Sequence, residues 1–240
     1  MEKALNHENT DIDANLLTMA RYGRSIRRLR RPRASLAMQT VAAEIIRLLT
    51  FKSTVSILDL GYGSGRHWNG ITLPCSVSLT VIDASEDWVK ANVSPRPNTI
   101  LIGVMPPVLN DLEDSSFDIV IAYDLIEHLP KHEGVLLVYH MQRLAKSMAF
   151  LYTPNGFVWQ PPSDDNPYNA HLSGWSVGEL KALGWSSFQG HGGNRYLVGP
   201  YGVGKFRSKN MLLQNLLTVL HTLSNCSPKL SFGISATIRH

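Results

Sequence analysis

The chain has 240 residues, of which 44% are hydrophobic and 18% are charged. This composition fits a globular domain with a full-sized core, and it excludes a disordered, collagen-like or coiled-coil chain. The 23 basic and 19 acidic residues give a net charge of +4. Residues 1–33 alone hold eight basic and four acidic residues, so the excess charge lies there and the rest of the chain is neutral.

No apolar stretch reaches the ~20 residues that a membrane-spanning helix needs. The first 15 residues also lack the apolar core of a signal peptide. We therefore expect a cytoplasmic protein without a membrane span. The two cysteines, Cys75 and Cys226, form neither a disulfide framework nor a metal-binding pattern.

Residues 21–33 contain seven arginines and no acidic residue. If this segment is helical, five of the arginines share one broad face and apolar side chains lie on the other. Because arginine binds phosphate through two parallel hydrogen bonds, Arg27 and Arg28 are candidate ligands for an anionic small molecule. A solvated helix face, an acidic partner or RNA is also compatible with the pattern. RNA is the second choice, because the rest of the chain is neutral.

After this segment, helix-like and strand-like stretches alternate. Apolar residues at helical spacing predict a helix over residues 34–49. Strands are predicted at residues 55–60, 78–83, 99–104, 117–124 and 148–153, with helices after Ser85 and over residues 133–145. This alternation predicts an α/β fold, with a Rossmann-like, open, mostly parallel sheet and helices on both faces.

The rhythm changes after Pro154. Residues 154–175 are rich in Pro, Asn, Asp and Gly, which indicates a loop or lid. Helices are predicted over residues 176–183 and around residues 211–223, and a last strand over residues 230–239. We assign residues 1–50 to an N-terminal helical cap and residues 51–240 to the main domain.

The strongest motif is ILDLGYGSGRH at residues 57–67. A buried strand ends near Asp59, and Gly61, Gly63 and Gly65 allow a tight turn that a ligand can approach closely. The next strand ends at Asp83, where a carboxylate can accept hydrogen bonds from ribose hydroxyls. Both features fall at the carboxyl ends of the strands, where open α/β sheets bind their ligands.

Two classes of cofactor suit such a motif. A dinucleotide prefers the spacing Gly-x-Gly-x-x-Gly, but Arg66 stands where its third glycine belongs. An acidic residue just before the turn suits a ligand that carries an ammonium group. Asp59 therefore favours S-adenosylmethionine, whose amino-acid end has that group.

Three ordered segments, residues 57–67, 81–85 and 115–129, resemble the successive motifs of class I S-adenosylmethionine-dependent methyltransferases. The resemblance covers roughly residues 55–155. It implies that Asp83 binds the ribose, that Ala84 lies beside the adenine and that Tyr123 contacts the cofactor from the opposite side. The complete set of cofactor-binding residues that it implies is Asp59, Gly61, Tyr62, Gly63, Gly65, Asp83, Ala84, Met105 and Tyr123.

The chain departs from the family pattern after the third predicted strand. The family usually has an acidic residue there that binds the adenine amino group, whereas Val104 and Met105 follow Gly103 here. Adenine recognition would then depend on backbone groups and on packing against Met105.

Candidate catalytic residues come from two places. His128 follows the fourth predicted strand, and His171 lies in the predicted lid; either could act as a general base toward a hydroxyl acceptor. Each could instead have only a structural role. His128 and His132 are four residues apart, but Pro130 between them makes a shared helical face unfavourable, so we expect no metal site.

Aromatic residues of the lid, including Tyr168 and Trp175, could form the wall of an acceptor pocket. Alternatively, they attach the lid to the core. We expect methyl transfer from S-adenosylmethionine to a small-molecule or sugar-type acceptor, at oxygen, including phosphorylated acceptors. An RNA methyltransferase and a non-catalytic cofactor-binding partner subunit are the alternatives. The oligomeric state stays open.

Overall fold

The computed structural model describes residues 36–90, 95–163, 166–194, 212, 216, 219–220 and 223–240. Arg27 and Arg28 lie outside the described residues, as does most of the helix predicted around residues 211–223. Within the described part of the chain, no helix is both long and apolar enough to cross a membrane.

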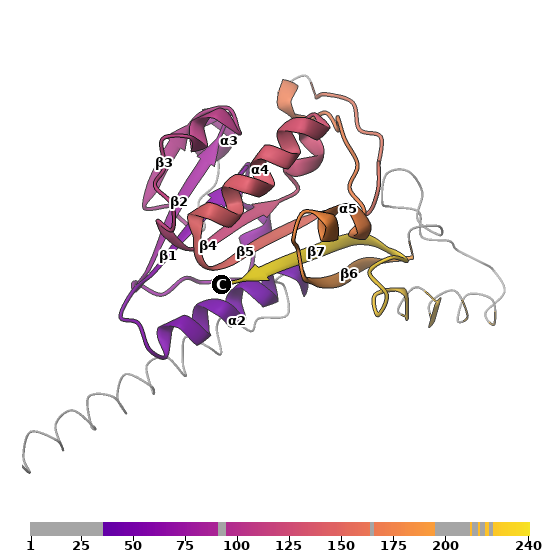
Figure 1. The fold of residues 1–240 in the computed structure, drawn as a ribbon, viewed down its shortest axis with the longest axis horizontal. Helices are drawn as coiled ribbons and strands as arrows, with labels where there is room; N and C mark the ends of the chain where they lie inside the picture. Colours follow the sequence, from indigo (N-terminus) through magenta and orange to yellow (C-terminus); the bar gives the residue numbers. More distant parts are fainter. Residues whose placement is uncertain are drawn as a thin grey trace, which may run out of the picture.

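Seven strands form one sheet, in the order β3-β2-β1-β4-β5-β7-β6 (Figure 1). They are β1 (Val55–Leu60), β2 (Val77–Asp83), β3 (Thr99–Ile102), β4 (Phe117–Tyr123), β5 (Ala145–Pro154), β6 (Ser187–Asn194) and β7 (Ser231–Arg239). The pairs among β1 to β5 are parallel, and β7 runs antiparallel to both of its neighbours. The predicted open, mostly parallel, Rossmann-like sheet is confirmed.

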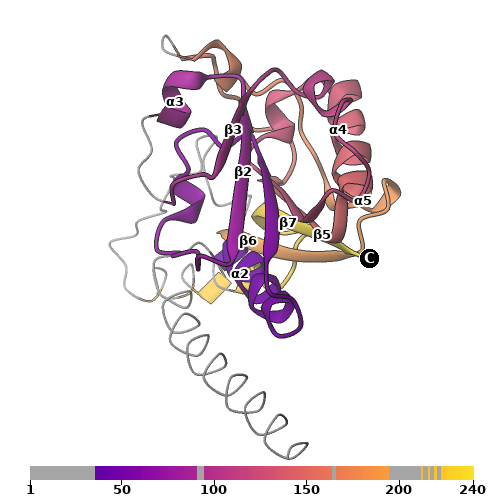
Figure 2. The same cartoon turned by 90° about the vertical axis from the view of Figure 1, so that its left-hand side faces the viewer.

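Helices cover both faces of this sheet, as predicted. They are α2 (Leu36–Leu49), α3 (Glu86–Lys90), α4 (Lys131–Leu144) and α5 (Val177–Ala182). Figure 2 shows α3 and α4 on opposite sides of β1 and β2. Because successive strand residues point to opposite faces, Ile57 joins the apolar core under α2, and Leu58 joins the core under α4.

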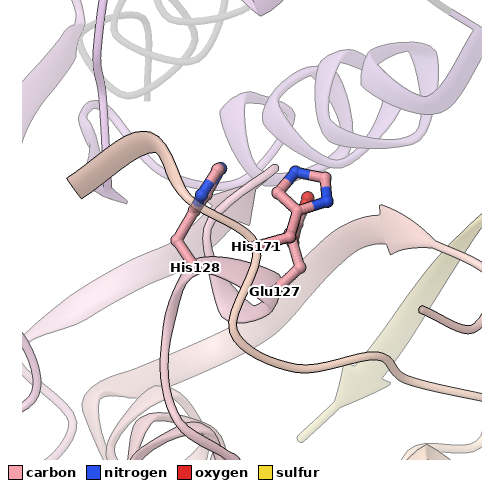
Figure 3. Close-up of side chains that lie close together, drawn as sticks. All are labelled: Glu127, His128 and His171. Carbon is pink, nitrogen blue, oxygen red and sulfur yellow. The ribbon is translucent and has the colours of Figure 1, made fainter. Parts of the chain in front are cut away.

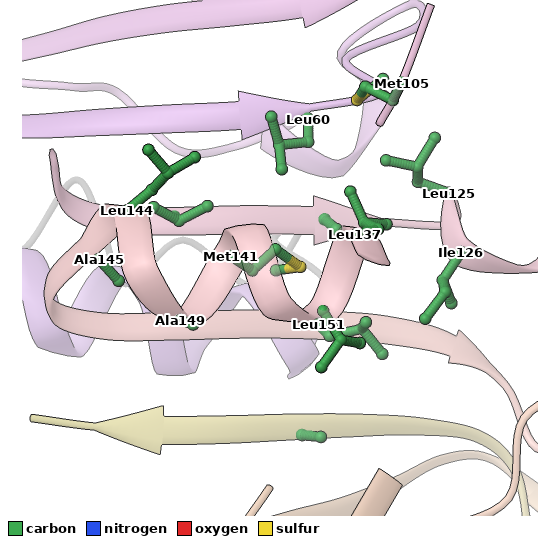
Figure 4. Close-up of a cluster of buried hydrophobic side chains, with 14 of the residues drawn as sticks. Leu60, Met105, Leu125, Ile126, Leu137, Met141, Leu144, Ala145, Ala149 and Leu151 are labelled. Atoms are coloured by element: carbon green, nitrogen blue, oxygen red, sulfur yellow. The ribbon is translucent and has the colours of Figure 1, made fainter. Parts of the chain in front are cut away.

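The core under α4 also holds the turn that follows β4. Leu137 and Met141 of α4 are fully buried against the sheet, and Leu125 and Ile126 of the turn belong to the same cluster (Figure 4). Burying an aliphatic side chain of this size contributes about 1.5–3 kcal/mol to stability. The apolar side of the turn is therefore anchored in the core, which fixes the position of Glu127 and His128 next to Ile126.

Most predicted boundaries agree with the structure to within three residues, and β6 is the main element without a prediction. Its sequence, SFQGHGGN, contains three glycines and lacks a strand-like apolar pattern. Close packing explains one of them, since a Cβ atom at Gly190 would lie 2.6 Å from Oγ of Ser231 in β7. Tertiary packing, rather than local preference, makes this segment a strand.

Of the proposed N-terminal cap, only α2 is described. Its apolar residues Met38, Val41 and Ile45 are fully buried in the core on one face of the sheet. The assignment of residues 1–50 as a separate cap stays a prediction.

Candidate active site

The glycine turn after β1 has the conformation that its sequence predicts. Gly61, Gly63 and Gly65 have φ angles of 69°, 54° and 63°, values that favour glycine. A Cβ atom at Gly61 would lie only 2.8 Å from the Leu125 side chain. The turn is therefore packed closely against Leu125, which lies two residues after the end of β4, while all three glycines line a cavity.

Asp83, at the end of β2, closes this turn from the neighbouring strand. Its Oδ2 accepts a hydrogen bond from the Gly63 amide at 2.6 Å, and its Oδ1 accepts one from the Ser85 amide at 2.8 Å. Burial raises the pKa of this carboxyl group, and the two backbone amides act in the opposite direction. Each oxygen keeps a further lone pair, so the carboxylate can also accept hydrogen bonds from ribose hydroxyls.

Two cavities of about 530 Å³ and 130 Å³ meet at this edge of the sheet. Both are lined by Gly61, Gly63, Trp88, Asp124, His128 and Asn169. The smaller one adds Asp83, Ala84 and Met105, and the larger one adds Tyr62 and Tyr123. Because they share part of their lining, they form one continuous site with the glycine turn between its two halves.

Asp59 lies near the end of β1, two residues before Gly61. It lines neither cavity and is fully buried, and its Oδ2 accepts hydrogen bonds from the rings of His67 and Trp68 at 2.7 and 2.6 Å. Asp59 therefore does not face either cavity directly, because these two rings cover its Oδ2, and its assignment as a cofactor-binding residue stays a prediction. Its Oδ1, however, is buried without a hydrogen-bond partner among the described residues.

Tyr123, at the end of β4, lies in a stack of rings. Its ring is stacked between those of His67 and Tyr152, with centroids 5.1 and 4.3 Å apart. All three residues line the larger cavity. The stack therefore forms a flat aromatic wall; sequence reasoning missed Tyr152, whose strand gave no motif signal.

The turn after β4 carries two acidic residues with raised pKa values. Asp124 has a φ of 50° and opens into the cavity, yet displacement of bulk water by the surrounding protein raises its pKa to about 6. Burial also raises the pKa of Glu127, and the neighbouring Asp124 adds to the effect. Oε2 of Glu127 accepts a hydrogen bond from the Thr153 hydroxyl at 2.8 Å. Neither carboxyl group was selected from the sequence, yet both line the larger cavity.

His128 and His171 come together in the larger cavity (Figure 3). Their ring centroids are 4.8 Å apart. Nδ1 of His128 lies 3.0 Å from the carbonyl oxygen of Ala170, and Nδ1 of His171 lies 2.7 Å from that of Val158. Because a carbonyl oxygen only accepts hydrogen bonds, both rings carry their proton on Nδ1, and each Nε2 has a free lone pair.

Burial keeps both imidazoles neutral. It lowers the pKa of His128 to about 4, with His171 acting in the same direction and the carbonyl groups of Ala170 and Asn169 opposing it. Burial also lowers the pKa of His171, against the effect of the Val158 carbonyl. Near neutral pH, both Nε2 atoms are therefore hydrogen-bond acceptors.

Backbone hydrogen bonds hold the predicted lid against the turn after β4. The carbonyl oxygen of Glu127 accepts hydrogen bonds from the amides of Leu172 and Ser173 at 2.8 and 3.0 Å. This contact places His171 beside His128, although 43 positions separate them in the sequence. The structure thus brings together two candidate catalytic residues that the sequence identified only separately.

Trp175 does not line either cavity, which corrects its prediction as an acceptor-binding residue. It is 1% exposed, and its Nε1 donates hydrogen bonds to Ser173 Oγ and to the Ile126 carbonyl oxygen. The ring fits over Gly134 of α4, where a Cβ atom would lie 2.3 Å from Cζ2. The alternative interpretation, attachment of the lid to the core, describes this residue.

Other aromatic residues surround the site. Tyr168 is half-exposed and lines the smaller cavity, on the side of Asp83 rather than in the larger cavity. Trp159, also exposed, lines the larger cavity. Trp88 lines both and was not predicted, because its helix carries no motif.

Residues 58–153 match the family model of a methyltransferase domain. With the sheet order and the glycine turn, this match shows that the chain contains the domain of a class I S-adenosylmethionine-dependent methyltransferase. It is an enzyme of that class, with S-adenosylmethionine as its methyl donor.

Solved structures share the fold at low sequence identity. A candidate sarcosine dimethylglycine methyltransferase from Galdieria sulphuraria is 16% identical, with a TM-score of 0.52 and 84% of each chain covered. An S-adenosylmethionine-dependent methyltransferase from Archaeoglobus fulgidus is 17% identical, with a TM-score of 0.47, covering 84% of this chain and 94% of its own. None of the curated proteins compared matches the sequence.

The residues of the site fit this cofactor. Oδ1 of Asp59 is a buried acceptor without a partner among the described residues, which is costly unless a donor such as an ammonium group satisfies it. The glycine turn lines the larger cavity, Asp83 can take the ribose, and Ala84 and Met105 line the cavity where adenine would lie. At the position after Gly103, where the family usually has an acidic residue, Val104 lines the cavity instead.

Proposed function

We propose that the enzyme transfers the methyl group to an oxygen atom of a small-molecule or sugar-type acceptor bound in the larger cavity. One observation carries this proposal: two neutral imidazoles with free Nε2 atoms line the cavity that continues from the cofactor site. His128 lines both cavities and therefore lies at their junction.

S-adenosylmethionine supplies a methyl group already activated by its sulfonium, so the protein mainly supplies alignment and a proton acceptor. The acceptor hydroxyl donates a hydrogen bond to Nε2 of His128 or His171. The same Nε2 takes the proton when the oxygen gains the methyl group.

Aromatic side chains support a flat or sugar-type acceptor. Tyr123 and Tyr152 form one wall of the cavity, and Trp159 lies at its edge. Such faces pack well against sugar or aromatic rings.

An anionic acceptor is a further part of the proposal, and it comes from the sequence alone. Arg27 and Arg28 would bind its phosphate or carboxylate. Replacing both with alanine should then lower activity only toward phosphorylated acceptors.

The test is a screen of paired acceptors, phosphorylated and unphosphorylated, with a coupled assay for S-adenosylhomocysteine. We expect turnover with a hydroxyl-bearing small molecule or sugar. Turnover only with RNA would favour an RNA methyltransferase. Cofactor binding without product from any acceptor would favour a non-catalytic partner subunit.

A further inference from the structure

Glu127, His128 and His171 form a compact group of metal-binding side chains (Figure 3). Their ligand atoms all lie within 4.8 Å of one another. We propose that this group binds a divalent transition-metal ion of the zinc type, and that the bound ion blocks the proton acceptor of the reaction. The blocking step rests on the proposed function, whereas the ion site itself does not.

The donor set selects the class of ion. Two imidazole nitrogens and one carboxylate suit zinc and its neighbours in the first transition row, whereas magnesium and calcium prefer oxygen ligands only. Three protein ligands also leave a coordination position open toward the cavity.

Hydrogen bonds at Nδ1 leave Nε2 as the atom with which each imidazole would bind the ion. In metal sites, the ring nitrogen that does not bind the ion usually donates its proton to a carbonyl or carboxylate oxygen. Here the Nδ1 atoms of His128 and His171 make these hydrogen bonds, to Ala170 and Val158. The Thr153 hydroxyl likewise holds the Glu127 carboxylate.

The geometry requires only a small contraction. At a bond length of ~2.1 Å, a tetrahedral ion holds its ligand atoms about 3.4 Å apart. The longest separation of 4.8 Å must therefore shorten by roughly 1.4 Å. His171 belongs to the lid and Glu127 to the turn, so rotation of these side chains can close the site.

Among the described residues, neither Asp124 nor Glu127 forms an ion pair with a lysine or arginine. Lys131, a cation on the first turn of α4, is paired with Glu179 at 2.7 Å instead. No lysine or arginine among the described residues is therefore paired with the carboxyl group that would bind the ion.

Ion and acceptor proton compete for the same atoms. A neutral imidazole with its proton on Nδ1 has a single lone pair in the ring plane, on Nε2. When that lone pair binds an ion, it cannot take the proton of a hydroxyl group. Zinc should therefore bind to the enzyme and inhibit it.

The site differs from the pair of His128 and His132, which the sequence analysis rejected as a metal site. His132 is exposed on α4, and the described structure does not bring it into the group. His171 from the lid replaces it. His132 is therefore a matched control for the other two histidines.

We would strip tag-free enzyme of metal with a chelator and titrate it with zinc against a chromophoric chelator. Cobalt absorption in the visible range would report the ligand geometry. We expect one equivalent of zinc to bind to the wild type and to His132→Ala. His128→Ala, His171→Ala and Glu127→Gln should each weaken binding by at least about 100-fold, with melting curves to confirm folding. Zinc should inhibit turnover, and chelator should restore it.

The proposed zinc site is refuted if zinc binds to the wild type no more tightly than to folded His171→Ala. If zinc increases turnover, the proposed competition between the ion and the acceptor proton for Nε2 is refuted. The proposed function has a separate test, because it fails if the metal-free enzyme methylates no oxygen acceptor. If the metal-free enzyme is active but binds no zinc, only the ion site is refuted.

Discussion

The carboxylate of Asp83 accepts a hydrogen bond from the backbone amide of Gly63 at 2.6 Å. This contact joins the two motifs that identify the class of enzyme, because one residue ends β2 and the other lies in the turn after β1. Asp83 therefore holds the turn in shape, and its remaining lone pairs leave it able to bind the ribose, which is the role that the resemblance implies.

Asp83→Ala should lower the affinity for S-adenosylhomocysteine by at least about 100-fold, because two charge-assisted hydrogen bonds of roughly 1.5–3 kcal/mol each are lost. Calorimetric titration measures the affinity, and circular dichroism checks the fold. Asp111→Ala, on an exposed loop, is the control and should bind like the wild type. Unchanged affinity in Asp83→Ala would refute the assignment of the ribose site.

Gly134→Ala and Gly178→Ala should have opposite effects, although both place alanine in a helix. At Gly178 the nearest atom to a new Cβ is 3.9 Å away, so we expect a gain of about 0.5–1 kcal/mol from helix propensity. At Gly134 the Cβ meets Trp175 at 2.3 Å, and overpacking should cost about 1–3 kcal/mol. Thermal unfolding checks both; equal melting temperatures would contradict the packing of Trp175.

Disturbing the packing of Trp175 should also lower the activity of the enzyme. Trp175 attaches the lid that carries His171, so Gly134→Ala should reduce turnover at temperatures where it remains folded. The turnover of Gly178→Ala should equal that of the wild type.

His128→Ala and His171→Ala should lower kcat by roughly 10²–10⁴-fold if these rings take the acceptor proton. Affinity for S-adenosylhomocysteine should stay within about twofold, because neither ring holds the turn or Asp83. His132→Ala should match the wild type in both measurements. If kcat is unchanged in both site variants, the imidazole base is the wrong mechanism.

His191 should make the protein sensitive to acid. Burial lowers its pKa to about 4, against an ordinary value of 6.5, so the unfolded chain binds more protons between these values. Stability from this residue is complete above pH ~6.5 and is lost as the pH falls toward 4. From pH 7 to pH 5 the loss is on the order of 2 kcal/mol.

Urea unfolding at both pH values would test this effect. His191→Gln has no group that titrates, and its amide can keep a hydrogen bond to the Ser235 hydroxyl, which lies 2.8 Å from Nε2 in the wild type. We expect the pH dependence to shrink by the same amount in this variant. An identical dependence in both proteins would show that His191 does not cause it.

Much of the fold was predictable because its signals are local. β1, β2 and β4 are short apolar runs that end at polar residues or glycine, and such runs mark buried parallel strands. β6 was not predictable, because Gly190 is required by contact with Ser231 and the strand forms by pairing with β7, and both are remote in the sequence.

The same distinction applies to the site. Gly63, Asp83 and Ala84 lie within recognisable motifs, and the structure places them on the cavities. The contact between His128 and His171 depends on hydrogen bonds to the Glu127 carbonyl, which no local pattern encodes. Trp175 was wrongly placed because the space over Gly134, which receives its ring, is visible only in three dimensions.

The position of β7 has a consequence for the order in which the chain can assemble. β6 pairs with the sheet only through β7, yet β7 comes about forty residues later in the sequence. During synthesis, the parallel strands can therefore associate before β7, the partner of β6, has been made. Insertion of the later strand between β5 and β6 completes the sheet in one step, so we expect β6 and β7 to become protected from amide hydrogen exchange together.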